Sequence, residues 1–278
     1  MLLLNNTRYK MTDNVLTIKT IQVGPFKTLI TCLKEILEET NITFQADGMR
    51  IVTMDKTENI LIHTHLEASK FQTYDCKKEK IIIAVNMQQL YSLVDSINPD
   101  DILTIYIKNE HYSYGIVDFL CLTFENGTTN QCINFVLKLI DPDTNEVVCP
   151  IIPYSAIILL PSSDFQKNIR ILSGKGADKV EITSIGDELR FKISGLYLDT
   201  AEIIRTEKND SMEFKQKQSS SKIIQGVFSL KTLMYFTKCT SLCQQIELYL
   251  ENNKPLIVKY NVASLGVIKL CLSSVQDE

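Results

Sequence analysis

Residues 26–55 read FKTLITCLKEILEETNITFQADGMRIVTMD, and this stretch contains the pattern that organises the whole chain. Its first half places apolar residues at the i, i+3, i+4, i+7 spacing of an amphipathic helix, which predicts a helix over residues 26–39. Its second half alternates apolar and polar residues around Asp47-Gly48, a dipeptide typical of β-hairpin turns. The stretch therefore predicts one helix followed by two antiparallel strands.

The same pattern recurs three times along the chain. Apolar stripes and stop signals predict further helices over residues 86–97, 162–173 and 229–239. Ser162 or Ser163 is the predicted N-cap of the second of these. After each of these helices, two stretches of alternating apolar and polar residues flank a polar pair, at 109–110, 186–187 and 252–253. Around the first pair, the two stretches cover residues 103–107 and 112–117. Four helix-plus-hairpin units are the simplest interpretation.

A connector divides these units into two pairs. Residues 139–154 hold several Asp and Pro residues that oppose regular structure, and we interpret them as an interdomain connector. This predicts an α+β fold of two similar domains, 1–138 and 155–278, each made of two helix-plus-antiparallel-strand units. The polar stretch 208–222 is predicted to be an exposed loop.

Composition places the chain among soluble globular proteins and excludes several classes. It has 278 residues, 29 Lys plus Arg against 33 Asp plus Glu, and a formal charge of −4, which argues against a uniformly basic coat for nucleic acid. Eight cysteines without a CxxC motif indicate reduced thiols of an intracellular protein. The apolar run at residues 2–4 is too short for a signal peptide, and no run approaches the ~18 residues of a membrane span. We therefore expect neither secretion nor a membrane partner.

Basic residues recur on three of the predicted helices. The first and fourth helices each carry a lysine pair at i and i+7, within about 20° of each other around the helix axis, and the third carries two basic residues three apart. These positions are Lys27, Lys34, Lys167, Arg170, Lys231 and Lys238. They fit either a lining for a polyanion or ordinary solvated helix faces, and the pattern alone leaves both open.

Signals for catalysis are weak. His63 and His65 point to the same face of a predicted strand, but the sequence places no third metal ligand beside them. The run 173–176, Ser-Gly-Lys-Gly, lacks the spacing of a phosphate-binding loop. A metal-dependent enzyme using the two histidines is therefore only an alternative, and we predict no enzymatic activity and no cofactor.

Several ordered motifs resemble the eukaryotic sliding clamp family, proliferating cell nuclear antigen. They are Phe26–Asp55, Phe71–Cys76, Leu137–Asp141, Leu160–Ser162 with Phe165, Phe228–Lys238 and Pro255–Tyr260. The resemblance runs from about Ile18 to Leu272 in one register, and its divergence points to a large DNA virus or a protist. It implies a DNA-clamp fold in which three subunits form a closed ring around duplex DNA, without enzymatic activity.

The resemblance also assigns sites. It implies that the six basic residues named above line the hole, whereas Ser92 and Asp95 replace family lysines on the second helix. It implies ring closure through strands at 131–138 and 200–205. It implies a pocket under the connector for short partner peptides, formed by Met54, Leu61, Val147, Pro150, Tyr154 and Pro255. Cys271 and the run 272–274, Leu-Ser-Ser, depart from the family there.

The expected partners are therefore duplex DNA of any sequence, a DNA polymerase and other proteins that carry clamp-binding peptides, with a clamp loader as a further candidate. The expected location is the nucleus, or a host nucleus or cytoplasmic viral factory. A checkpoint-type clamp subunit, a monomeric viral processivity factor and a protein-binding adaptor are the alternatives.

Overall fold

The computed structural model describes residues 13–98, 100–143, 147–149, 151–195, 198–207, 211–217 and 222–275. These residues form four α-helices: α1 (Val23–Lys34), α2 (Met87–Asp95), α3 (Ser162–Ser173) and α4 (Leu230–Phe236). Each helix buries one apolar stripe, such as Phe26, Leu29 and Leu33 of α1. Among the described residues no helix is long and apolar enough to cross a membrane.

The largest sheet has nine strands and runs through both halves of the chain. Its strands, in spatial order, are β16 (Glu213–Gln216), β12 (Ala156–Pro161), β18 (Gln245–Leu250), β19 (Leu256–Val262), β20 (Gly266–Leu272), β4 (Ile60–Glu67), β3 (Gly48–Met54), β2 (Glu39–Gln45) and β6 (Ile81–Asn86). Antiparallel pairing of β20 with β4, from Gly266 opposite Leu66 to Leu272 opposite Ile60, joins the two halves. The nine strands therefore form one continuous surface.

Two smaller sheets complete the described strands, apart from one short pair. The five-stranded sheet has the order β11 (Gln131–Lys138), β10 (Phe119–Asn126), β7 (Ile102–Lys108), β1 (Asn14–Thr20) and β5 (Thr73–Cys76). The four-stranded sheet has the order β15 (Leu198–Thr206), β14 (Glu188–Gly195), β13 (Lys179–Ile185) and β17 (Ile223–Ser229). Strands β11 and β15 are edge strands of their sheets, each with one side unpaired.

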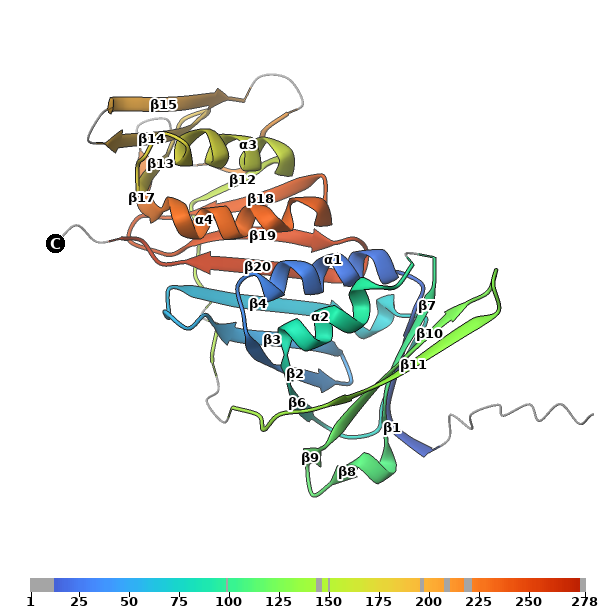
Figure 1. Ribbon diagram of the computed structural model, residues 1–278. Helices are drawn as coiled ribbons and strands as arrows, with labels where there is room; N and C mark the ends of the chain where they lie inside the picture. Colours follow the sequence, from blue (N-terminus) through green and yellow to red (C-terminus); the bar gives the residue numbers. More distant parts are fainter. Residues whose placement is uncertain are drawn as a thin grey trace, which may run out of the picture.

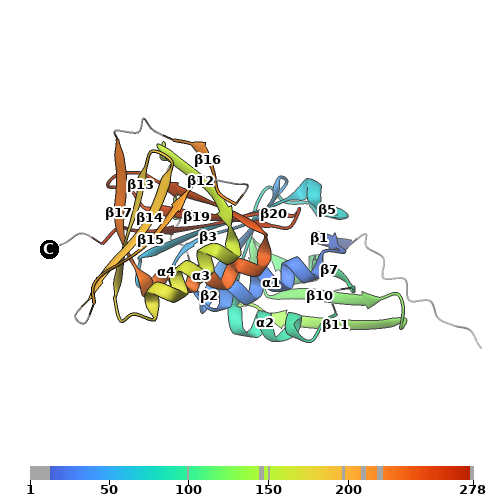
Figure 2. The same ribbon diagram turned by 90° about the horizontal axis from the view of Figure 1, so that it is seen from above.

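All four helices lie on one face of the large sheet (Figures 1 and 2). They follow one another in the order α3, α4, α1, α2, and α1 contacts both α2 and the short helix η4 (Thr237–Leu242). The core fills the space between helices and sheets. Tyr260 is fully buried there, and its hydroxyl donates to the Phe236 carbonyl at 2.9 Å, which satisfies the last turn of α4.

The structure confirms the predicted α+β class with helix-plus-strand units, but several boundaries were wrong. Helix α1 begins at Val23 and ends at Lys34, not at 26 and 39. The earlier start is possible because Pro25 lies in the first turn, where no intrahelical N–H partner is needed. Neither predicted serine caps α3; Pro161 occupies the N-cap position. The Ser162 hydroxyl lies within 3.2 Å of the Thr240, Cys243 and Gln244 carbonyl oxygens and can hydrogen-bond them.

Two predicted segments were also wrong. The expected hairpin of 103–107 with 112–117 does not form, because η3 (Asn109–His111) and the separate pair β8 (Tyr112–Ser113) and β9 (Ile116–Val117) intervene; β7 pairs with β10 instead. The stretch 208–222 is not simply a loop, since β16 lies within it and pairs with β12. One further short helix, η2 (Ala68–Lys70), follows β4.

Candidate functional site

The basic helix residues lie on the helix side of the molecule, but only some of them have a nearby carboxylate. Lys167, Arg170 and Lys231 are exposed, and no ion pair involves them within the described part of the chain. A hollow of about 420 Å³ beside α4 is lined partly by Lys231, Tyr235 and Lys238. The C-terminal half thus presents available cations.

Carboxylates neutralise part of the N-terminal half. Lys27 hydrogen-bonds the Asp95 carbonyl and has its Nζ 3.4 Å from the Asp95 Oδ1. Glu35 lies 3.5 Å from Lys34 and 3.8 Å from Lys238, and Lys34 also stands over the Tyr91 ring at 3.8 Å. The side of the molecule that carries the basic residues is therefore less positive around α1 and α2 than around α3 and α4.

Helix α2 carries this counter-charge in a defined network. Hydrogen bonding to Asp95 raises the pKa of Tyr91, one turn earlier on the same helix face. Asn86 caps the helix by accepting from the Gln89 amide at 3.0 Å. The resemblance indicated that Asp95 replaces a family lysine, but its pairing with Lys27 depends on the packing of α1 against α2. The pairing of Glu35 with Lys34 and Lys238 was not predicted, because it also depends on how the helices pack.

The opposite face of the nine-stranded sheet carries an apolar row. Register places Met54, Leu61, Cys271, Ile257 and Tyr249 side by side across β3, β4, β20, β19 and β18. Met54 is 36% exposed, whereas Cys271 is buried, and its burial and the nearby Cys149 raise its pKa to about 12. Tyr249 and Ile257 were not predicted from the sequence as part of this row, since only the strand order brings them to it.

Both ends of the connector contact residues of the large sheet or its loops. At one end the Asn41 side chain donates to the Asp143 carbonyl at 2.7 Å and accepts from its N–H at 3.1 Å. At the other end the Tyr154 hydroxyl donates to the Pro255 carbonyl at 2.9 Å, and its ring meets Tyr249 edge-on at 5.6 Å.

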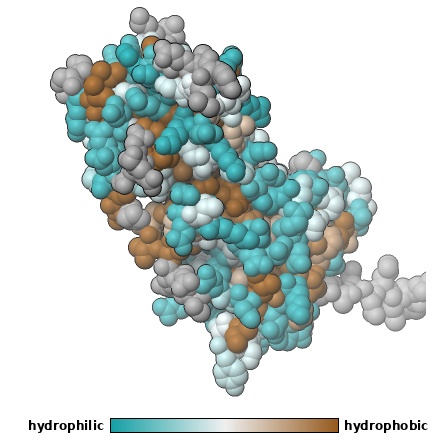
Figure 3. Space-filling model, turned by 60° about the vertical axis from the view of Figure 1, so that its left-hand side comes forward, coloured by the Kyte–Doolittle hydropathy of each residue, from teal (hydrophilic) through white to brown (hydrophobic). Residues whose placement is uncertain are grey.

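Not every predicted pocket residue is equally placed. Tyr154 is buried, Leu61, Val147 and Pro255 are half-buried, and Pro150 lies outside the described residues. Val148 of the connector is 80% exposed, so part of the connector surface is apolar. On the face in Figure 3, hydrophobic surface is broken into separate patches by hydrophilic residues.

The two histidines share one strand face, as predicted. Neither joins a third ligand: within the described residues no group of three or more His, Cys, Asp or Glu side chains could hold a metal ion. Burial, then Lys269 and Arg50, lower the pKa of His63. This neighbourhood of cations disfavours a bound metal cation.

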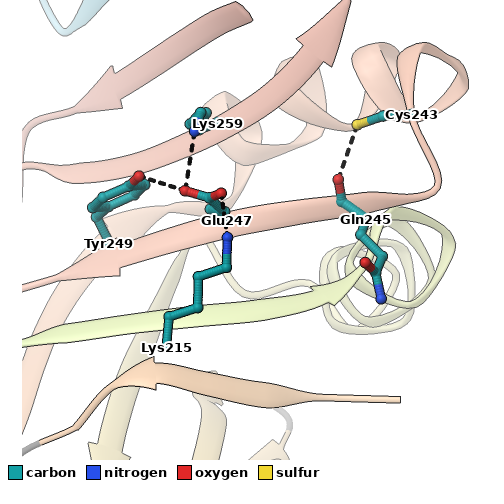
Figure 4. A network of polar contacts seen from close by, with 6 residues as sticks. All are labelled: Lys215, Cys243, Gln245, Glu247, Tyr249 and Lys259. Atoms are coloured by element: carbon teal, nitrogen blue, oxygen red, sulfur yellow. Dashed lines mark hydrogen bonds and ion pairs between the residues drawn. The ribbon is translucent and has the colours of Figure 1, made fainter. Parts of the chain in front are cut away.

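Farther along the same sheet face, a carboxylate network links three strands (Figure 4). Glu247 of β18 accepts from Lys215 at 2.7 Å, from Lys259 at 3.2 Å and from Tyr249 at 2.5 Å. Burial alone would raise the pKa of Glu247, but these bonds outweigh it and lower the pKa to about 2. The network ties β16, β18 and β19 on the face away from the helices.

Four helices, three of them with basic residues, lie on one face of a sheet shared by two halves, and an apolar row lies on the other face. This arrangement is that of the DNA-clamp fold. Family models agree: the N-terminal domain of proliferating cell nuclear antigen matches residues 15–147, and the C-terminal domain of proliferating cell nuclear antigen matches residues 149–275. The chain belongs to the proliferating cell nuclear antigen family, and we conclude that it is a DNA sliding clamp.

Individual relatives support this assignment. A "probable DNA polymerase sliding clamp 1" of Paramecium bursaria Chlorella virus 1 is 31% identical over 265 residues, covering 95% of this chain and 98% of that protein. A "probable DNA polymerase sliding clamp" of Acanthamoeba polyphaga mimivirus is 31% identical over 230 residues, covering 83% of this chain and 48% of that protein. The crystal structure of the Entamoeba histolytica antigen shares the fold, with a TM-score of 0.83 and 21% identity over 95% of this chain and all of that one.

Proposed function

We propose that three copies of this clamp close into a ring around duplex DNA, with α1 to α4 facing the hole and the nine-stranded sheet facing outward. The observation that carries this proposal is the pair of unpaired edges: β11 ends one sheet and β15 ends another. Val136 on β11 and Ile204 on β15 are 61% and 49% exposed. Exposed apolar side chains on edge strands are consistent with pairing to a strand of another subunit. Head-to-tail pairing of two different edges builds rings.

The same proposal covers the sites and boundaries. We assign 1–138 and 155–278 as the two clamp domains and 139–154 as the connector. Lys27, Lys34, Lys167, Arg170, Lys231 and Lys238 would meet phosphates without reading bases. The pocket of Met54, Leu61, Val147, Pro150, Tyr154 and Pro255 would hold peptides of a DNA polymerase and other replication proteins. The clamp would work where DNA is replicated, in a nucleus or a viral factory, without catalysing a reaction.

Charge reversal tests the lining. A variant with Lys27, Lys231 and Lys238 changed to Glu should lose duplex DNA binding in fluorescence anisotropy at low salt, and its stimulation of the polymerase from the same source should disappear. The slope of log affinity against log salt should fall by about one for each phosphate that the variant no longer neutralises. The oligomeric mass should stay unchanged, because these side chains belong to α1, α4 and η4 and not to β11 or β15.

The matched control reverses exposed lysines outside the four helices, Lys70, Lys192 and Lys254, and so changes net charge equally. It should bind DNA almost as the unchanged protein does. Equal losses in both variants, or undiminished binding by the first, would remove the lining assignment.

A further inference from the structure

Three basic side chains stand next to one another on the outer face of the nine-stranded sheet. His63 of β4 lies opposite Lys269 of β20, and Lys269 lies opposite Lys259 of β19. We call these three residues the basic row. All three are half-buried and alternate with residues such as Ile62, Ile268 and Val258, whose side chains are buried in the core beneath the helices.

The charges in this row are not balanced. Like charges placed directly opposite on neighbouring strands destabilise a sheet, yet Lys259 and Lys269 are such a pair. Lys259 is compensated by Glu247 at 3.2 Å, which it shares with Lys215 (Figure 4). Lys269 has no carboxylate within 4.0 Å among the residues that the structure describes. One cation therefore stands uncompensated in the middle of the row.

The residues around Lys269 add to this imbalance. The buried His63 Nδ1 has no hydrogen-bond partner in the described part of the chain, and neither do Arg50 Nε and the His65 Nε2. Asp47 already bonds Arg50 and lies 4.0 Å from His65. The described strands beside Lys269 therefore offer its ammonium group no carboxylate, and a ligand that brings one would compensate that charge.

The basic row adjoins the apolar row of the peptide pocket. Leu61 is two residues before His63 on β4, and Cys271 is two residues after Lys269 on β20, so both rows lie on one face. At ~3.3 Å per residue the rows are about 7 Å apart along the strands. A segment whose anchor occupies the pocket therefore reaches the basic row with its next few residues.

We propose that the basic row binds acidic side chains that flank the anchor of a partner peptide, and so selects partners with an acidic flank. This inference rests on the proposed peptide pocket. Acidic protein side chains fit better than DNA phosphates, because the row lies on the sheet face opposite the helices. Rim charges of this kind contribute modestly to affinity and mainly to choice of partner.

Synthetic peptides test this directly. Each peptide carries one aromatic and aliphatic anchor segment, with four Glu or four Gln residues added at either its N- or its C-terminal end. In isothermal titration at low salt, the Glu peptide extended at one of the two ends should bind the full-length protein about fivefold more tightly than the Gln peptide extended at the same end. Lys269→Gln should close that gap and leave Gln-peptide affinity unchanged. Lys192→Gln, an exposed lysine of β14, is the control for net charge and should keep the gap.

Each other outcome is decisive. Equal affinities for every Glu and Gln pair, a gap that survives Lys269→Gln, or a gap that Lys192→Gln also closes would overturn the inference. Binding of Gln peptides without a Glu preference would leave the proposed pocket intact and remove only the basic row. Failure of every peptide to bind would remove both. Lys269-dependent binding of a short DNA duplex in place of the peptides would assign the row to nucleic acid and contradict the inference.

Discussion

One carboxylate, Glu247, connects three strands at the end of the large sheet. Its three donors come from β16, β18 and β19, so its charge is worth more to the fold than a surface ion pair. The pKa of Glu247, about 2, lies below the 4.5 of the free side chain. A carboxyl group with a depressed pKa in the folded state stabilises the protein above the unfolded pKa, and this contribution is lost as the pH falls through the folded pKa.

We therefore predict that Glu247→Gln lowers the free energy of unfolding by about 1–2 kcal/mol at pH 7, after allowance for solvent screening. The difference from the unchanged protein should shrink between about pH 4.5 and pH 2, because the unchanged protein loses the Glu247 charge that the variant never carries. Urea unfolding across this range measures it, with exposed Glu79→Gln as the control. A deficit that stays constant down to pH 2 would show that the charge does not carry the effect.

At the scale of elements, periodicity in the sequence predicted the existence and type of all four helices. It did so because apolar stripes such as that of α1 are local, and burial against the sheet reinforces them. It failed where a contact between residues far apart in the chain decides the structure. The Ser162 hydroxyl bonds carbonyl groups of residues 240–244 and does not cap α3. Strand β16 forms by pairing with β12, which the local sequence does not indicate. The basic candidates were predictable one by one, but their counter-charges and the apolar row depend on packing and strand order.

Helix α2 yields a prediction at this scale. Asp95 holds Lys27, so Asp95→Asn should free that cation, tighten duplex DNA binding about two- to fivefold at low salt and steepen its salt dependence. Fluorescence anisotropy over a salt series measures the affinity and its salt dependence. The control is Asp75→Asn on β5, which removes one negative charge from an exposed position elsewhere. Equal gains in the two variants would mean that only net charge matters; no gain for Asp95→Asn would mean that Lys27 does not face the DNA.

For the whole molecule, a net charge of −4 conceals two different faces. Available cations gather on α3 and α4, and acidic residues neutralise part of the charge on α1 and α2. The sheet face opposite the helices holds the carboxylate network and the basic row. A ring would repeat this arrangement around one hole, where weak phosphate contacts hold DNA without stopping it from sliding. Ring closure, not affinity, would then keep the clamp on DNA.

Retention on DNA of different topology tests that claim most directly. Clamp loaded on nicked circular DNA should remain bound at high salt in gel filtration and should be released when the circle is cut to a linear molecule. The free protein should have roughly three times the 31.7 kDa chain mass, and Ile204→Glu on β15 should lower both mass and retention. Equal retention on circular and linear DNA, or a single-chain mass with undiminished retention, would contradict a closed ring.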